Sequence, residues 1–125
     1  MKTFNSVEEM KPYYNEETNT YEFVEDGKRL DVEFGFDLTI RSNIHAGDIH
    51  ARNITARDIT ARGITVGNIT AKNIDARNIT AWNITARDID ARNITAGNVT
   101  AWNITAENIN AGVIITYGIK AQDVK

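Results

Sequence analysis

Few side chains in this sequence have the chemistry of a catalytic or metal-binding site. His45 and His50 are the two histidines, with Asp48 between them, and such groups serve as acid-base catalysts and zinc ligands. Asp75 and Asp90 form a candidate pair of catalytic carboxylates. The histidines and this pair occupy outward positions of a repeat. We therefore expect the histidines on adjacent walls and the pair on different walls next to arginines. The sequence predicts no enzyme, no metal and no cofactor.

A second group of candidates consists of basic residues and tryptophans at one variable position of the repeat. Tryptophan and arginine are common anchors of protein interfaces, and together they can also stack bases and neutralise phosphates. The two tryptophans are not needed by the fold, because glycine or glutamate occupies the same position elsewhere. The candidate partner-binding residues are Arg52, Arg57, Arg62, Lys72, Arg77, Trp82, Arg92 and Trp102.

Length and composition favour one small body. The chain has 125 residues, a formal net charge of -3 and no cysteine, which excludes a disulfide framework, a zinc-thiolate site and a thiol nucleophile. We find no signal-peptide pattern and no apolar stretch long enough to span a membrane, so we expect a cytoplasmic protein. Charge is uneven: residues 1–36 have a net charge of -5 and residues 37–125 a net charge of +2.

The rest of the chain is organised by a five-residue repeat. Ile or Val occurs every five residues from Ile44 to Val124, and Ala usually follows two positions later. Neither a helix nor a flat strand has a period of five, so the chain must turn after each pentad. We interpret Ile-Thr-Ala as an extended wall with Ile and Ala inward. The next two residues, often ending in Asn, Asp or Gly, form a corner.

The number of walls per turn is predicted from the spacing of like residues. Trp82 and Trp102 are four pentads apart, as are Gly47 and Gly67, which favours a 20-residue turn of four walls and about four stacked turns. This spacing would place the variable residues on three edges and the asparagines in ladders. The predicted edges are Arg52, Lys72 and Arg92; Arg57, Arg77 and Gly97; and Arg62, Trp82 and Trp102. The predicted ladders are Asn53, Asn73 and Asn93, and Asn78 with Asn98.

Residues 1–36 are predicted to form an acidic cap on the first turn, and residues 37–125 to form the coil. Ser6 and Glu9 form a capping-box pattern for a short helix. Asp26-Gly27 lies between two alternating apolar segments and predicts a β-hairpin whose second arm spans residues 30–40. One extra residue between Ile40 and Ile44 predicts a bulge where cap and coil meet.

The repeat of residues 43–125 resembles the pentapeptide-repeat family, whose members form right-handed, four-sided β-helices. The order of large and small residues is reversed here, because that family usually shows A-[DN]-L-x-x. The opening M-K-T-F-N-S-V-E-E-M-K-P-Y-Y-N-E-E-T-N-T-Y is similar to the start of small proteins encoded by phages and prophages of Gram-positive bacteria. The fold class implied is all-β: a right-handed quadrilateral β-solenoid with an N-terminal β-hairpin cap.

This resemblance also implies a function, since some members of the family mimic duplex DNA and inhibit enzymes such as topoisomerase. Our hypothesis is a non-enzymatic, phage-encoded protein that inhibits a bacterial DNA-acting enzyme, a defence nuclease or a topoisomerase, by protein contact or DNA mimicry. The alternatives are direct nucleic-acid or glycan binding through the Arg/Trp edges, or a structural module. The candidate phosphate surrogates are Glu8, Glu9, Glu16, Glu17, Glu22 and Glu25. Outward Ile115 and Tyr117 predict a homodimer through the C-terminal coil.

Overall fold

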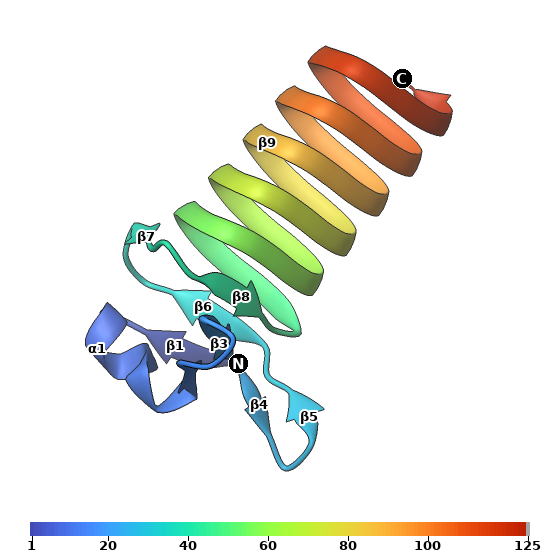
Figure 1. The fold of residues 1–125 in the computed structure, drawn as a ribbon. Helices are drawn as coiled ribbons and strands as arrows, with labels where there is room; N and C mark the ends of the chain where they lie inside the picture. The colour runs from blue at the N-terminus through green and yellow to red at the C-terminus, as the bar shows by residue number, and fades with distance from the viewer. Residues whose placement is uncertain (125) are drawn as a thin grey trace.

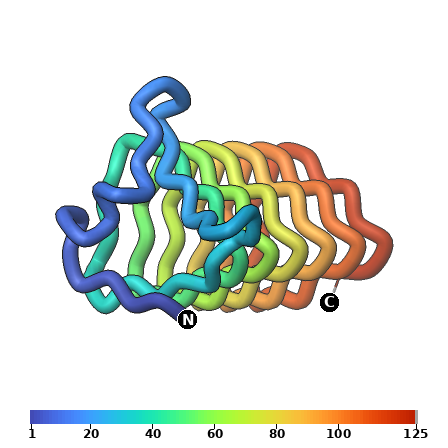
Figure 2. The backbone as a smooth tube through the Cα atoms, turned by 90° about the horizontal axis from the view of Figure 1, so that it is seen from below, coloured from blue at the N-terminus to red at the C-terminus, as the bar shows by residue number. Residues whose placement is uncertain are grey.

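The computed structural model describes residues 1–124; Lys125, the last residue of the predicted coil, lies outside this range. Almost all of the chain is β-structure (Figure 1). The coil is one long winding strand, β9 (Asp48–Val124), and the N-terminal elements lie at one end of it. Figure 2 shows the turns stacked one behind another, with the N-terminal residues across the near end.

Each turn of the coil consists of three pentads. Ile44 pairs in parallel with Ile59, and the amide of Arg62 donates a hydrogen bond of 2.9 Å to the carbonyl of Gly47. Both contacts join positions of the same kind in successive turns, so the prediction of a 20-residue, four-walled turn was wrong. The 77 residues of β9 make about five turns, with a length of about 24 Å at the usual spacing of about 4.8 Å between strands.

The interior of the coil is filled by the inward side chains of its three walls. Each wall points one Ile and one Ala toward the axis, and the Ile side chains from Ile44 to Ile109 are almost completely buried. With three walls these side chains fill the axis, as expected from the few voids of protein interiors. A typical turn therefore buries three Ile and three Ala side chains along the axis of the coil.

The N-terminal elements stack on the coil in the same parallel manner. The sheet order is β1-β6-β9-β8-β3-β2, and β7 also pairs with β9. These short elements are β1 (Lys2–Phe4), α1 (Val7–Met10), a 3-10 helix (Lys11–Tyr13), β2 (Tyr14–Asn15), β3 (Thr20–Glu22), β4 (Val24–Glu25), β5 (Lys28–Arg29), β6 (Val32–Phe34), β7 (Leu38–Thr39) and β8 (Asn43–His45). Since β3 and β8 already pair in parallel, the stacking begins within the N-terminal residues.

The short helix begins as its sequence indicates. The Ser6 hydroxyl accepts a hydrogen bond of 3.4 Å from the amide of Glu9, and the Glu9 carboxylate accepts one from the amide of Asn5. These two contacts satisfy amide donors that a helix start leaves unpaired. The α-helix ends at Met10, two residues before Pro12, which has no backbone N–H and lies in the 3-10 helix that continues to Tyr13.

The predicted hairpin exists, but it is much shorter than expected. β4 pairs antiparallel with β5, and Asp26 and Gly27 between them have φ of 51° and 75°, as a tight hairpin turn requires. The expected second arm, residues 30–40, does not continue this hairpin. It divides into β6 and β7, which pair in parallel with β9, because its apolar side chains are buried by stacking on the Ile core.

Aromatic residues close the first turn. Phe4, Phe23 and Phe34 are each at most 2% exposed, and their ring centroids lie 5.2 to 6.2 Å apart. The register also contains the predicted extra residue, because Thr39 pairs with Thr55, one position beyond the spacing that joins Ile44 to Ile59. The turn that joins the N-terminal region to the coil is therefore one residue longer than the turns above it.

Candidate functional site

The three walls of the coil present three different outer surfaces. Within each pentad the first, third and fifth residues point outward, because side chains alternate along an extended chain. A residue in one turn lies over the equivalent residue three pentads earlier, and we call such a stack a column. Face 1 comprises residues 58–62, 73–77, 88–92, 103–107 and 118–122. Face 2 comprises residues 48–52, 63–67, 78–82, 93–97 and 108–112. Face 3 comprises residues 53–57, 68–72, 83–87, 98–102 and 113–117.

Face 3 is the surface with the clearest binding chemistry. Its five segments read NITAR, NITAK, NITAR, NVTAW and VIITY, so among the described residues this face carries no carboxylate. Its middle column presents exposed hydroxyls. Its members are Thr55, Thr70, Thr85 and Thr100, followed by Ile115.

One border of face 3 joins basic residues to aromatic ones. The column, here called the basic-aromatic edge, contains Arg57, Lys72, Arg87, Trp102 and Tyr117. The Arg87 guanidinium lies 5.7 Å from the centre of the Trp102 ring, a cation–π geometry. Tyr117 packs edge-on against Trp102 with centroids 5.8 Å apart. Because Trp102 and Tyr117 are still 59% and 89% exposed, most of both rings is accessible.

The opposite border of face 3 is formed by the last column of face 2. It contains Arg52, Gly67, Trp82, Gly97 and Gly112. An added Cβ would lie 2.7 Å from the Trp82 carbonyl oxygen at Gly97 and 2.6 Å from the Arg52 carbonyl oxygen at Gly67, so the backbone contacts at both positions are too close for a side chain. Glycine on both sides leaves the Trp82 indole 77% exposed. A hollow of about 450 Å³ next to it is lined by Phe34, Arg52, Val66 and Trp82, among others.

Face 1 has the opposite character. Its pentads from residue 58 to residue 107 contain five carboxylates, and Asp75 and Asp90 lie in adjacent turns of one column. The expectation that these two lie on different walls was wrong, because they are three pentads, or one full turn, apart. A groove of about 950 Å³ runs along this face between the column of Asp75 and Asp90 and the column of Arg62, Arg77 and Arg92.

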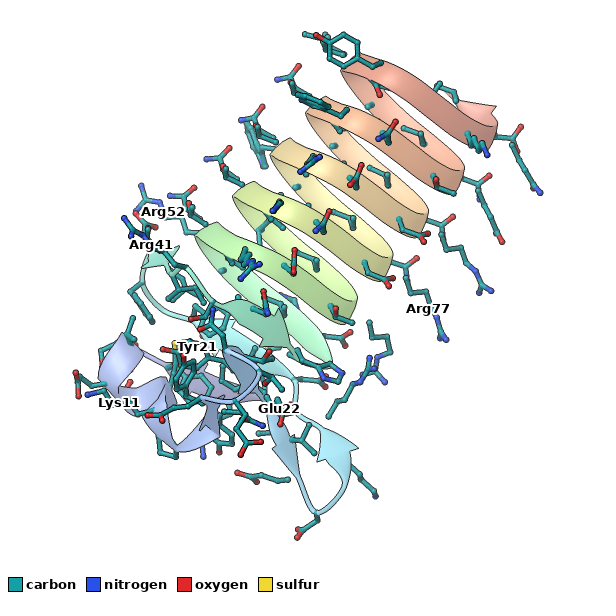
Figure 3. All side chains as sticks on the ribbon, viewed as in Figure 1. Lys11, Tyr21, Glu22, Arg41, Arg52 and Arg77 are labelled. Carbon is teal, nitrogen blue, oxygen red and sulfur yellow. The ribbon has the colours of Figure 1, made fainter. Side chains whose placement is uncertain are left out.

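The arginines of face 1 are partly neutralised. Arg62 contacts Asp31 at 3.2 Å and Asp48 at 3.3 Å, and Arg92 lies 3.8 Å from Glu107. The hydrogen bond to Asp48 and its charge, with that of Asp31, raise the pKa of Arg62 above its ordinary value. Arg77 takes part in none of the ion pairs found among residues 1–124. Figure 3 shows Arg77 and Arg52 projecting from opposite sides of the coil.

Asparagine ladders run along the corners with the three-pentad spacing, so their predicted members were wrong although ladders exist. On face 3 each amide donates to the one below at 2.7 to 2.8 Å, along Asn98, Asn83, Asn68 and Asn53. On face 1 asparagine and aspartate alternate, and the ladder divides into two pairs, Asn73 with Asp58 and Asn103 with Asp88. On face 2 the ladder contains Asn78, Asn93 and Asn108. These contacts give the corner residues a structural role.

The predicted membership of the three edges was also wrong. Arg52, Lys72 and Arg92 lie on three different edges, as do Arg57, Arg77 and Gly97. Trp82 and Trp102 do not stack, since they are four pentads apart and a turn has three. Arg62 belongs with Arg77 and Arg92, Arg57 with Lys72 and Trp102, and Arg52 with Trp82. Sequence reasoning missed Arg87, whose signal was the basic run at residues 57, 72 and 87.

The six predicted phosphate surrogates of the N-terminal region fall into two groups. Glu8 pairs with Lys11 at 2.9 Å, Glu9 binds the amide of Asn5, and Glu25 accepts a hydrogen bond from Tyr13. The other three predicted phosphate surrogates, Glu16, Glu17 and Glu22, line a hollow of about 600 Å³ together with Tyr13 and Tyr14. The first group is engaged in contacts within the protein, although the Glu8 side chain is still 77% exposed, and the second group takes part in none of the ion pairs found among residues 1–124.

The two histidines lie on adjacent walls, as expected: His50 is on face 2, and His45 is in the pentad 43–47, which stacks on the first pentad of face 1. His45 pairs with Glu22 and Thr60 of the neighbouring strands and is half-buried, with Nε2 lacking a hydrogen-bond partner. Burial, and then the charge of Arg29, lower the pKa of His45, which the Glu22 charge partly opposes. Within the described residues no cluster of three or more His, Asp or Glu side chains could hold a metal ion.

Comparison with known proteins gives no relative whose function could explain these surfaces. No family model, curated protein sequence or solved structure matches the chain. No helix in residues 1–124 has the length and apolar character needed to cross a membrane.

Proposed function

We propose that the chain is a non-enzymatic binding protein that engages a macromolecular partner through face 3 and its two borders. The observation that supports this most is the distribution of side chains over the three faces. Trp82, Trp102 and Tyr117 border one carboxylate-free surface that also carries Arg57 and Arg87. Exposed aromatic and arginine side chains supply most of the binding energy in many interfaces.

The proposed partner is a bacterial enzyme that processes nucleic acid, and the proposed setting is the cytoplasm of a bacterium that carries the chain on a phage. This follows from the resemblance to pentapeptide-repeat proteins and from the phage-like N-terminus. An inhibitor of such an enzyme can occupy either the enzyme or its substrate. Mimicry of DNA would use the carboxylates Glu16, Glu17 and Glu22, which line one hollow at the opposite end of the molecule from Tyr117.

The experiment that tests face 3 places a photo-crosslinking residue at equivalent central positions of the three faces. The positions are Thr85 on face 3, Thr80 on face 2 and Thr105 on face 1, all exposed threonines. Crosslinking in bacterial lysate, followed by mass spectrometry, should yield one recurrent nucleic-acid-processing protein from the Thr85 position. Equal products from all three positions, or none from Thr85, would contradict the proposal.

We also propose that two copies associate through the C-terminal end of face 3. Ile115 and Tyr117 are 62% and 89% exposed, and Val113 beside them is 52% exposed. Apolar side chains gathered in this way are typical of contact surfaces. Light scattering should give twice the mass of one chain for the native protein and one chain mass for the Ile115→Ser, Tyr117→Ser variant. A monomeric native protein at high concentration would exclude the homodimer.

A further inference from the structure

We infer that face 3 binds single-stranded nucleic acid directly, with the strand running along the coil axis. This inference rests on the proposed role of face 3 as a binding surface, and it adds single-stranded nucleic acid to the protein partner proposed above. Phosphates would lie along the basic-aromatic edge beside Arg57, Lys72 and Arg87, and bases would stack on Trp102 and, across the face, on Trp82.

The charge of face 3 suits a phosphate backbone. Arg57, Lys72 and Arg87 occupy three successive turns, about 4.8 Å apart, and Arg52 carries a fourth positive charge on the other border. Of the ion pairs found among residues 1–124, none includes these four residues. Lys and Arg side chains that are not neutralised within the protein can replace the counterions of phosphates, which provides most of the sequence-independent affinity for nucleic acid.

Aromatic side chains continue the same column where the basic residues end. Trp102 follows Arg87 in the next turn and is 59% exposed, so its ring can receive a base, while Tyr117 above it belongs to the proposed dimer contact. On the other border, Gly67 and Gly97 carry no side chains on either side of Trp82, whose indole is 77% exposed. Basic side chains that follow the backbone, combined with rings for base stacking, characterise surfaces for single-stranded nucleic acid.

A single strand fits this arrangement better than a duplex. In a duplex the faces of the bases are covered by their neighbours, so rings at the border of a flat surface could not stack on them. A single strand exposes its bases, and the Thr column between the borders offers exposed hydroxyls to sugars and base edges. The described length of face 3 is five turns, or about 24 Å, which is sufficient for several nucleotides.

Face 1 provides the matched contrast. Its Arg column has the same spacing as the basic-aromatic edge, but Asp75 and Asp90 form the opposite side of its groove, and Glu107 follows Arg92 in the Arg column. These carboxylates would repel phosphates. Arg77 is therefore a suitable control for Arg87: removing either changes the net charge equally, but Arg77 shares a groove with Asp75 and Asp90, whereas Arg87 lies between face 3 and the first column of face 1, which contains Asp88.

The test is fluorescence anisotropy of the full chain with labelled single-stranded DNA and RNA of about 12 nucleotides, a length within the usual range of site sizes. The logarithm of the affinity should fall with the logarithm of salt concentration with a slope of about -2 to -3, as expected for three or four phosphate contacts. Arg87→Ala should reduce this slope by about 0.7, and Arg77→Ala should leave it unchanged. Trp102→Ala should weaken binding about tenfold or more.

Circular dichroism and thermal unfolding serve as the folding control. Trp102 is exposed, so its removal should leave the fold intact, and equal melting of Arg87→Ala and Arg77→Ala excludes unfolding as the cause of weaker binding. A second measurement uses Trp82→Phe, in which Trp102 is the remaining tryptophan. Its fluorescence should be quenched on adding the single strand, because a stacked base contacts the indole.

Three results would overturn the inference. They are no binding at about 50 mM salt, equal loss of affinity for the Arg77→Ala and Arg87→Ala variants, or a duplex bound as tightly as the single strand. The crosslinking experiment separates this failure from failure of the proposed function. If Thr85 still captures one nucleic-acid-processing protein while no oligonucleotide binds, face 3 recognises protein and only the inference is lost.

Discussion

Face 3 and face 1 have the same interior and opposite exteriors. Both are built on buried Ile and Ala columns with the same three-pentad stacking. On face 3 the outward columns carry Thr, Asn, basic and aromatic residues, and on face 1 they carry five carboxylates among three arginines. In this coil the inward residues therefore determine the fold, and the outward residues are free to determine which partner is attracted.

The largest expected effect tests whether the interior is equivalent under the two faces. Ile84 lies beneath face 3 and Ile89 beneath face 1, and they are 1% and 2% exposed. We expect Ile84→Ala and Ile89→Ala each to lower the free energy of unfolding by about 2 to 5 kcal/mol, because each leaves a cavity on the axis. Urea unfolding measures both losses. A large loss for one and almost none for the other would show that the two walls are not built alike.

The next effect concerns the ladders. On face 3 the Asn ladder is continuous, whereas on face 1 Asp88 accepts from Asn103 and, as a carboxylate, has no proton to donate to Asn73. Asp88→Asn should join the two pairs and stabilise the protein by about 0.5 to 1.5 kcal/mol, the usual contribution of one hydrogen bond. Asn83→Asp is the matched change on face 3 and should destabilise. Equal shifts of the same sign in thermal unfolding would disprove this account of the ladders.

A smaller effect is expected from the adjacent carboxylates of face 1. Asp75 and Asp90 occupy neighbouring turns of one column, so their charges repel. Replacement of one by the threonine found on face 3, Asp90→Thr, should raise the free energy of unfolding by about 0.2 to 1 kcal/mol at low salt. The gain should diminish when salt is added, because salt screens exposed charges. A gain that is independent of salt would point to packing instead.

The smallest effect concerns the end of face 1 next to the N-terminal elements. Since burial lowers the folded pKa of His45 below its ordinary 6.5, the neutral imidazole is favoured in the native state. The stability that this provides is present above pH 6.5 and decreases as pH falls through that value toward the folded pKa. His45→Gln should reduce the loss of stability between about pH 7.5 and about pH 5.5. Identical pH dependence of the two proteins in denaturant unfolding would contradict this role.

The sequence was sufficient to predict the five-residue period, but not the number of pentads in a turn. Ile every five residues, with a small residue two positions later, could only be a turning chain with Ile and Ala inside. Each pentad has similar corner chemistry, so three and four walls are locally alike. What separates them is how well the Ile and Ala side chains fill the axis, and that depends on all walls together.

The composition of face 3 could not be predicted for the same reason. The recurrence of Trp82 and Trp102 after four pentads suggested one edge, whereas the structure places Trp102 above Arg87 and beneath Tyr117. Arg62, Arg77 and Arg92 recur after three pentads, as do Asp75 and Asp90, and these were the signals of the correct turn. The hairpin was predicted from Asp26 and Gly27, but its length depended on stacking with β9 that no local pattern contains.

The most direct test of the three-pentad turn is a pair of engineered disulfides, since the natural chain has no cysteine. Thr70→Cys with Thr85→Cys joins positions that lie in one column of face 3, with Cα atoms about 4.8 Å apart, within the range that a disulfide spans. Thr65→Cys with Thr85→Cys joins positions four pentads apart, on face 2 and face 3. Under mild oxidation, mass spectrometry should detect an intramolecular disulfide in the first pair and free thiols in the second. A disulfide in the second pair, with free thiols in the first, would contradict the three-walled coil and the face 3 that it assembles.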